Sequence, residues 1–236
     1  MAPAERTPRE RYREQVKAEI KERAREQIAT AGVSALSLNA IAKRMGLSGP
    51  ALYRYFANRD ELITELVRDA YRSLADTFRR AAGEGAGLTG LARALRRWAL
   101  DDPQRYFLVY GTPVPGYRAP EDTREIAAEV MAVLIDACAD APGEPRTSAA
   151  AAASFEEHLA DHRAWDGGHP APAPALRRAL AFWTRLHGVL SLELAGQFGG
   201  MGFDPERLFA AELESLTAGT TGTTGTAETA ETADGA

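Results

Sequence analysis

The sequence has little of what marks secreted, membrane-spanning or disulfide-linked proteins. It contains one cysteine, Cys138, in 236 residues, so no disulfide can form within the chain. No apolar run is long enough to span a bilayer, and the polar N-terminal stretch lacks the apolar segment of a secretory signal. With 45% hydrophobic and 26% charged residues, the chain has the composition of a soluble globular protein, which we expect to lie in the cytoplasm.

Motifs of catalysis and of metal binding are also missing. There is no G-x-S-x-G and no phosphate-binding P-loop, and a formal G-x-G-x-x-G at residues 85–90 lacks the preceding strand that a dinucleotide site requires. His158 and His162 have a spacing that zinc uses on helices, but no further Cys or His is placed to complete four ligands. We therefore expect no enzyme activity, no cofactor and no metal, and we interpret Cys138 as a buried, inert thiol.

Alternating strand patterns are absent, and apolar residues recur at helical spacing, which predicts an all-α fold. The clearest case is a helix over 9–31, in which apolar residues follow one another every four positions from Tyr12 to Ile28. A long helix over 59–82 carries two apolar stripes. Further helices are predicted over 88–100, 104–110, 122–140, 148–162 and 175–198, and from Pro205 after Asp204 as N-cap, with loops over 111–120, 141–146 and 165–174.

One stretch, residues 37–56, predicts two short helices joined by a tight turn. The first covers 38–45, the turn lies at Gly46, and the second covers 49–55. Ser48 is placed to cap the second helix, and Pro50 lies in its first turn, where a missing N–H has no cost. Two helices joined at an angle by a glycine-containing turn form a helix-turn-helix, whose second helix enters the DNA major groove.

The residues of this stretch resemble the DNA-binding domain of the tetracycline-repressor (TetR) family. The resemblance covers the first quarter of the chain, and its residues are Gly32, Ser37, Ile41-Ala42, Gly46-Leu47-Ser48, Leu52 to Phe56 and Asn58 to Leu62. It implies a three-helix DNA-binding domain followed by a helical bundle that binds an effector and dimerises. The later helices resemble a subgroup of that family with a Trp, His, Gly pattern, matched here by Trp183, His187 and Gly188.

The expected domain organisation follows from these elements. We expect a disordered N-terminus (1–8), the helix-turn-helix DNA-binding domain (9–60), a linking helix (61–82), a connector (83–90), the ligand-binding and dimerisation domain (91–216) and a disordered tail (217–236). The first 60 residues hold 12 basic and 7 acidic residues, whereas the whole chain carries a net charge of −5. A basic end on an acidic protein suits contact with phosphates, although the alternating charges of the first helix also suit a solvated surface.

The predicted DNA contacts lie on the two motif helices and just beyond them. Arg54 is the long hydrogen-bonding side chain suited to guanine, while Gly49 and Ala51 are small enough for close approach and for contact with a thymine methyl group. The resemblance places phosphate contacts at Ser37, Tyr53, Tyr55 and Arg59. Asn39 and Lys43 lie near them on the first motif helix. A solvated charge remains the alternative for Arg54, and core packing the alternative for Tyr53. The full predicted set is Ser37, Asn39, Lys43, Ser48, Gly49, Pro50, Ala51, Tyr53, Arg54, Tyr55 and Arg59.

Aromatic residues of the later helices are candidates for an effector pocket. They are Trp98, Tyr106, Phe107, Tyr110, Tyr117, Phe155 and Trp183, together with His187. An ordinary hydrophobic core is the alternative for each of them, and a hydrogen-bonded core residue is the alternative for His187.

These observations favour a homodimeric, ligand-responsive repressor in the bacterial cytosol. Its expected partners are double-stranded DNA with a palindromic operator, a small, largely apolar or aromatic effector, and a second copy of the chain, with no membrane. Two alternatives remain open. One is a DNA-binding activator or an effector-independent DNA-binding protein; the other is a helical small-molecule-binding protein or enzyme with a coincidental helix-turn-helix.

Overall fold

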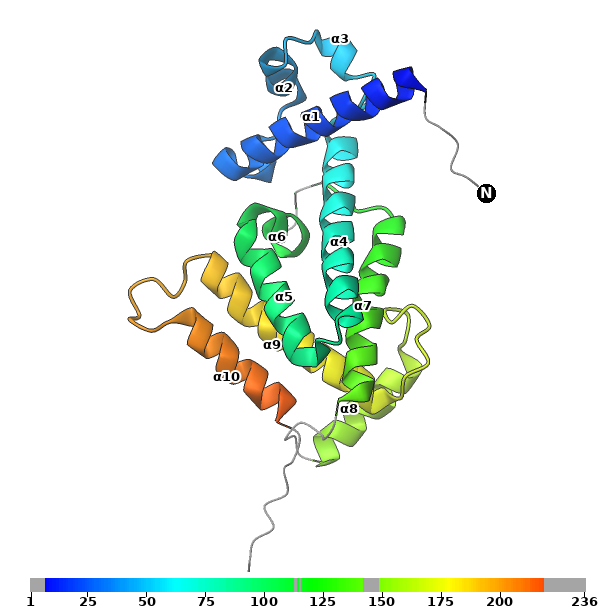
Figure 1. Ribbon diagram of the computed structural model, residues 1–236, viewed down its shortest axis with the longest axis vertical. Coiled ribbons are helices and arrows are strands. Elements are labelled where there is room, and N and C mark those ends of the chain that lie inside the picture. Colours follow the sequence, from blue (N-terminus) through cyan, green and yellow to red (C-terminus); the bar gives the residue numbers. More distant parts are fainter. Residues whose placement is uncertain (1–6, 113, 115, 142–148, 219–236) are drawn as a thin grey trace, which may run out of the picture.

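The computed structural model describes residues 7–112, 114, 116–141 and 149–218, and all of its regular structure is helical (Figure 1). The predicted all-α fold is confirmed. None of the helices in these ranges has the length and apolar character needed to cross a membrane. The elements are α1 (Pro8–Ala31), the 3-10 turn η1 (Val33–Ala35), α2 (Leu38–Arg44), α3 (Gly49–Leu52), α4 (Arg59–Gly83), α5 (Gly87–Asp101), α6 (Pro103–Tyr110), α7 (Asp122–Asp140), α8 (Ala149–Asp161), α9 (Ala173–Leu194) and α10 (Pro205–Thr217).

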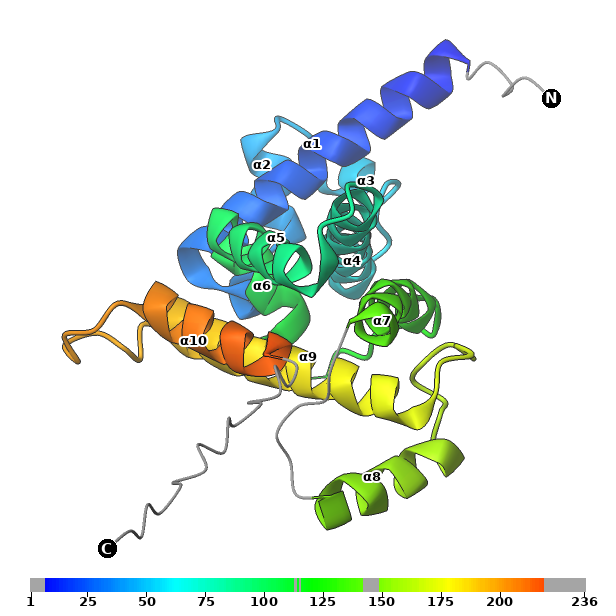
Figure 2. The same cartoon turned by 60° about the horizontal axis from the view of Figure 1, so that its bottom comes forward.

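The helices build two hydrophobic cores, one toward each end of the molecule (Figure 1). The smaller core joins α1, α2, α3 and the first half of α4, and we call residues 8–67 the reader. The larger core joins the second half of α4 with α5, α6, α7, α9 and α10, and we call residues 70–217 the body. Helix α8 packs on the outer side of α9 (Figure 2).

Helix α4 takes part in both cores because its apolar stripes continue along its whole length. Its N-terminus is capped by Asn58, whose side chain accepts a hydrogen bond from Glu61 N at 2.8 Å. The buried residues of its first half lie in the reader core, and those of its second half lie in the body core. They are Leu62, Ile63, Leu66 and Val67 in the reader, and Leu74, Ala75, Phe78 and Ala81 in the body.

The predicted connector at residues 83–90 is largely helical. Gly83 ends α4 and Gly87 begins α5, so three residues make the turn between them. Gly85 and Gly87 have φ angles of +71° and +56°, a region that glycine adopts without strain. The chain therefore reverses within a short turn, and α4 and α5 pack together in the body core instead of flanking a flexible linker.

Two helices end earlier than their apolar pattern predicted. Helix α3 ends at Leu52 rather than at residue 55, because Phe56 turns back into the reader core, where it is 1% exposed. Helix α9 ends at Leu194 rather than at residue 198. There Gly196 adopts a φ of +72°, and the N–H of Gln197 bonds to the carbonyl of Leu192 at 2.9 Å, which closes the helix with a Schellman motif.

The termini and two loops lie partly outside the described residues. This concerns residues 1–6 of the expected disordered N-terminus, residues 113 and 115 of the expected loop 111–120, residues 142–146 of the expected loop 141–146, and residues 219–236 of the expected tail. Helix α1 begins at Pro8, within the stretch expected to be disordered. Its start is fixed by a capping box, in which Thr7 and Glu10 satisfy each other's backbone N–H groups.

Candidate nucleic-acid interface

The angle between α2 and α3 is set by backbone and side-chain caps within the turn. Ser37 accepts from Ala40 N at the start of α2, and Ser48 accepts from Ala51 N at the start of α3, both at 3.3 Å. Between them, Gly46 has a φ of +66°, and the N–H of Leu47 bonds to the carbonyl of Ala42 at 2.9 Å. The predicted helix-turn-helix is therefore present, with its second helix shorter than expected.

The exposed surface of α2 and α3 holds most of the residues predicted to contact DNA. Ser37, Asn39 and Lys43 are exposed on α2, as are Ser48 and Pro50 at the start of α3. Beyond α3, Tyr53 is 45% exposed and Arg54 is exposed, while Gly49, Ala51 and Tyr55 are half-buried. Neither Lys43 nor Arg54 forms an ion pair with any residue that the structure describes. Two cations are thus available to an external anion.

Neither packing nor backbone geometry within the protein requires a glycine at position 49. A Cβ atom at Gly49 would lie 3.8 Å from Asn39 Oδ1, which is an ordinary van der Waals contact. Its backbone conformation is not one that requires glycine. A side chain would therefore fit inside the protein, and the open surface at Gly49 is suited to close approach by a partner.

Arg13 of α1 is a residue of this surface that the sequence analysis missed. Its guanidinium lies 6.0 Å from the centre of the Tyr55 ring, and its Nη2 donates to the carbonyl of Arg54 at 3.4 Å. Because Arg13 and Arg54 are 41 residues apart, no local pattern links them. Arg13 therefore holds the chain after α3 against α1 and adds a positive charge beside it.

Arg59 lies at the edge of this surface but its guanidinium is already engaged. Nε donates to the carbonyl of Leu36 at 3.2 Å, and Nη2 donates to the carbonyl of Val33 at 2.8 Å. These bonds tie the start of α4 to η1, just before α2. Both bonds orient the guanidinium toward backbone oxygens, so Arg59 has a positioning role within the reader. Its contact with phosphate stays a prediction.

Five of the eight predicted pocket residues come together where α6 meets α9. The ring of His187 lies 4.1 Å from Trp183, 4.4 Å from Tyr110 and 5.5 Å from Tyr106, measured between ring centres. Phe107 lies 5.6 Å from Tyr106. We call these five side chains the aromatic cluster. It joins two helices that are about 80 residues apart in the sequence.

The other three predicted pocket residues lie elsewhere. Trp98 is buried in the body core, and its Nε1 donates to Ser73 at 3.1 Å. Tyr117 packs against the reader core and its hydroxyl lies 3.1 Å from Thr64 Oγ1. Phe155 is 42% exposed on α8, where its ring stacks on that of His158. Phe155 is therefore remote from the aromatic cluster, because α8 packs on the outer side of α9 (Figure 2).

His187 is held neutral inside the aromatic cluster. Its Nδ1 lies 3.0 Å from the Tyr106 hydroxyl, and its Nε2 is buried without a hydrogen-bond partner among the described residues. Burial lowers the pKa of His187 to about 3 and raises the pKa of Tyr106 to about 12. Both side chains therefore act as uncharged hydrogen-bonding groups at neutral pH.

The residues considered earlier for metal binding and for nucleophilic chemistry pack against other parts of the protein. Cys138 is buried, and burial raises the pKa of its thiol to about 12. The imidazoles of His158 and His162 stack with ring centres 4.0 Å apart. Within the ranges that the structure covers, no three metal-ligating side chains gather.

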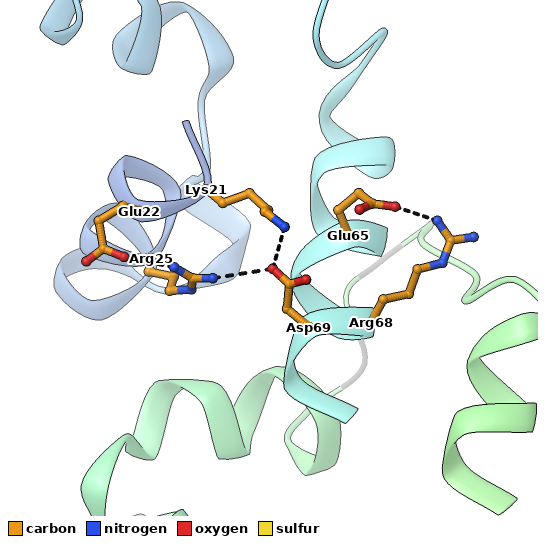
Figure 3. Close-up of polar contacts among 6 residues, drawn as sticks. All are labelled: Lys21, Glu22, Arg25, Glu65, Arg68 and Asp69. Carbon is orange, nitrogen blue, oxygen red and sulfur yellow. Dashed lines mark hydrogen bonds and ion pairs between the residues drawn. The ribbon is translucent and has the colours of Figure 1, made fainter. Parts of the chain in front are cut away.

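Ion pairs extend from α4 to the helices on either side of it and help to hold the reader on the body (Figure 3). Asp69 receives Lys21 Nζ at 2.7 Å and Arg25 Nη2 at 3.3 Å, both from α1. Its neighbour Arg68 points to the other side, where it pairs with Glu65 at 2.6 Å and with Asp122 at the start of α7. A cavity of about 540 Å³ lies beside the first set, between α1, α4 and α6. The position of the reader over the body is thus set partly by charge.

Comparison with known proteins agrees with this geometry. Residues 20–66 match the family of bacterial regulatory proteins described as the tetR family, and residues 88–216 match the tetracyclin repressor-like C-terminal domain. The chain is 38% identical over 216 residues to the HTH-type transcriptional regulator Rv1816 of Mycobacterium tuberculosis, covering 87% of this chain and 92% of the relative.

Solved structures show the same likeness. The crystal structure of SCO4313, which is described as a regulatory protein, is 70% identical and has a TM-score of 0.81, covering 89% of this chain and 98% of that one. PfmR, a TetR family transcriptional regulator from Thermus thermophilus, is 17% identical with a TM-score of 0.52 and shares the fold. The match covers 85% of this chain and 97% of PfmR.

Arg59 and Lys43 provide a test of their different roles. Arg59→Ala removes two bonds to carbonyl oxygens, and we expect the free energy of unfolding to fall by about 1–3 kcal/mol in a urea titration. Lys43→Ala leaves the fold unchanged, because its side chain is exposed and unpaired. It should instead reduce the slope of log affinity for DNA against log salt by about 0.9. A reduced salt slope in folded Arg59→Ala, with unchanged stability, would show that the assignment is wrong.

Proposed function

Because this chain belongs to the TetR family of DNA-binding transcriptional regulators, we propose that it acts as a homodimeric repressor released from its operator by a small molecule. The operator is palindromic, and the effector is largely apolar or aromatic. The observation that carries this proposal is the exposed, capped α2–α3 pair, joined to the body by one continuous helix, α4. Lys43 of α2 and Arg54 just after α3 form no ion pair with a described residue.

Recognition of the operator begins with the first turn of α3. Gly49, Pro50 and Ala51 present little bulk there, so the backbone can approach base edges and thymine methyl groups closely. Arg54 follows as the long side chain that can read guanine. Ser37, Asn39, Lys43, Ser48, Tyr53 and Tyr55 lie around this point and position the reader on the phosphates. A short recognition helix with few direct contacts leaves a share of specificity to DNA shape.

Dimerisation is supported by the outer surface of α9 and α10. A groove between them is lined by Gly188, Leu192, Leu208 and neighbouring residues, and Leu192 is 46% exposed. Gly188 lies inside α9, where glycine costs about 1 kcal/mol relative to alanine, and a Cβ atom there would meet open space. A second copy packed on this face covers the exposed Leu192 and comes close to the helix backbone at Gly188. The paired readers then address two half-sites about 34–36 Å apart.

Effector control is supported by a second cavity at the joint of reader and body. This cavity, of about 350 Å³, is lined by Ile63 and Val67 of the reader core and by Tyr71, Val109 and Thr123 of the body. The cavity lies where α4 meets α6 and α7, so a shift of the body helices beside it can favour one orientation of the reader over another. Decisive release of an operator requires roughly 5.5 kcal/mol of preference for the released state.

Footprinting on DNA upstream of the gene tests the proposed function directly. We expect purified full-length protein to protect a palindrome whose half-sites are one helical turn apart. Protection should be lost when an extract or compound that contains the effector is added. Protection that no effector changes would instead favour an activator or an effector-independent binder. A lack of sequence preference at moderate ionic strength would refute the repressor.

Substitution of Arg54 tests direct base readout. Arg54→Ala should cost about 1–3 kcal/mol of operator binding and relax the preference at one base pair per half-site, since a bidentate contact to guanine is lost. Selection of bound sequences from random DNA measures this preference. Arg44→Ala is the matched control, because Arg44 lies on the same motif but pairs with Glu26 at 2.9 Å. An unchanged sequence preference in Arg54→Ala would contradict the assigned role.

Substitution of Asp69 tests the ion pairs that hold the reader on the body. Asp69→Asn removes the charge that Lys21 and Arg25 contact, and we expect amide hydrogen exchange in the second half of α1 to become two- to fivefold faster. This corresponds to about 0.5–1 kcal/mol for a partly exposed pair. Asp76→Asn is the control, because Asp76 lies on the same helix but pairs with Arg79 within α4. Equal exchange rates in the two variants would show that Asp69 does not restrain α1.

A further inference from the structure

The aromatic cluster between α6 and α9 holds polar atoms that find no partner among the described residues. His187 Nε2 is buried and makes no hydrogen bond with any residue that the structure describes. The indole N–H of Trp183 and the hydroxyl of Tyr110 have no hydrogen bond within the described chain either. The three rings are mutual neighbours, with centres 4.1 to 5.6 Å apart, and each ring stays half-buried. A buried nitrogen without a partner among the described residues, set beside two flat rings, is suited to an external molecule.

The hydrogen bonds of Tyr106 define which kind of polar group is missing. Its hydroxyl lies 3.0 Å from His187 Nδ1 and 3.3 Å from the carbonyl oxygen of His187. One hydroxyl satisfies both contacts when it accepts from Nδ1–H and donates to the carbonyl. In this tautomer Nε2 carries no proton and is a hydrogen-bond acceptor. The buried atom therefore lacks a donor.

The surroundings of Nε2 also restrict the charge of its partner. The rings that contact His187 belong to Tyr106, Tyr110 and Trp183, and none of them carries a charge at neutral pH. An anionic group placed against them would be desolvated without a counter-ion, which is costly. A neutral O–H or N–H donor has no such penalty.

We propose that the effector is a flat, largely apolar molecule with a neutral hydroxyl group of the phenol type, which donates to His187 Nε2 while its ring lies against Trp183 and Tyr110. This assignment rests on the proposed function, because it names the ligand of that effector domain. Among the described residues Tyr110 is held by ring contacts and its hydroxyl makes no hydrogen bond, so its ring is the one that would have to shift for the ligand to enter.

The position of Tyr110 links this ligand to the reader. Its ring lies 6.2 Å from that of Tyr71, measured between centres, and Tyr71 lines the 350 Å³ cavity at the joint. The same cavity is bounded by Ile63 and Val67, which are buried in the reader core. A shift of Tyr110 would therefore act through Tyr71 on a cavity that α4 shares with α6 and α7.

Calorimetric titration of the full-length protein with three matched probes tests the proposal. The probes are 2-naphthol, its ether 2-methoxynaphthalene and the anion 2-naphthoate, at neutral pH. We expect wild-type protein to bind 2-naphthol about tenfold more tightly than either of the others, which is the worth of one hydrogen bond. His187→Phe keeps an aromatic ring but removes the acceptor, so the preference should fall to within twofold. The matched control His162→Phe, which is exposed just after the end of α8, should retain it.

Each other outcome counts against the proposal. Equal binding of 2-naphthol and its ether by wild type, tighter binding of 2-naphthoate, or binding of none of the three overturns it. A folded His187→Phe that keeps the tenfold preference overturns it as well. If His187→Phe does not fold, the wild-type preference and Trp183→Phe decide the matter: Trp183→Phe reduces the ring face but keeps the acceptor, so it should weaken all three probes alike and retain the tenfold preference, and unchanged binding of all three in that variant overturns the proposal. Operator binding is measured in parallel: an intact footprint without hydroxyl preference refutes the ligand alone, and absent operator binding refutes the repressor.

Discussion

Helix α4 buries side chains in two cores at once, and the arrangement of the remaining helices depends on this. Leu62 and Leu66 belong to the reader core, while Leu74 and Phe78 belong to the body core. An α-helix of 25 residues is close to a rigid rod, so its two ends cannot change orientation independently. A repacking of the body around Phe78 therefore alters the direction in which the reader is presented.

Polar contacts along α4 complement these cores. Arg68 and Asp69 are consecutive, and they extend to opposite sides, one toward α7 and the other toward α1 (Figure 3). Partly exposed ion pairs contribute little to stability, typically about 0–1 kcal/mol each. These pairs instead help to orient the helices, because each one holds a single neighbour of α4 in position. A joint of this kind favours one orientation without making it permanent.

Much of the fold could be predicted from the sequence because its signals are local. The apolar periodicity of α1, α4 and α7 and the serine caps of α2 and α3 can be recognised within a few residues. The structure has α1, α2, α4 and α7 at nearly the predicted bounds, and α3 begins where predicted. Two helix ends that the sequence analysis missed also have local signals. Gly196 is a C-terminal cap that ends α9, and Thr7 with Glu10 forms the capping box that begins α1. The end of α3 was different, because Phe56 turns inward to reach a core that local sequence does not describe.

The candidate site could be predicted only where one short segment builds it. The α2–α3 surface comes from 20 consecutive residues, and its exposed side chains lie together as their spacing predicts. The role of Arg59 depends instead on carbonyl oxygens 23 and 26 residues away. Tyr110 and Phe155 are equally aromatic and both helical, yet the first contacts His187 while the second faces solvent. The difference arises because α6 packs inside the body and α8 packs outside α9, and such packing is decided by contacts between distant helices.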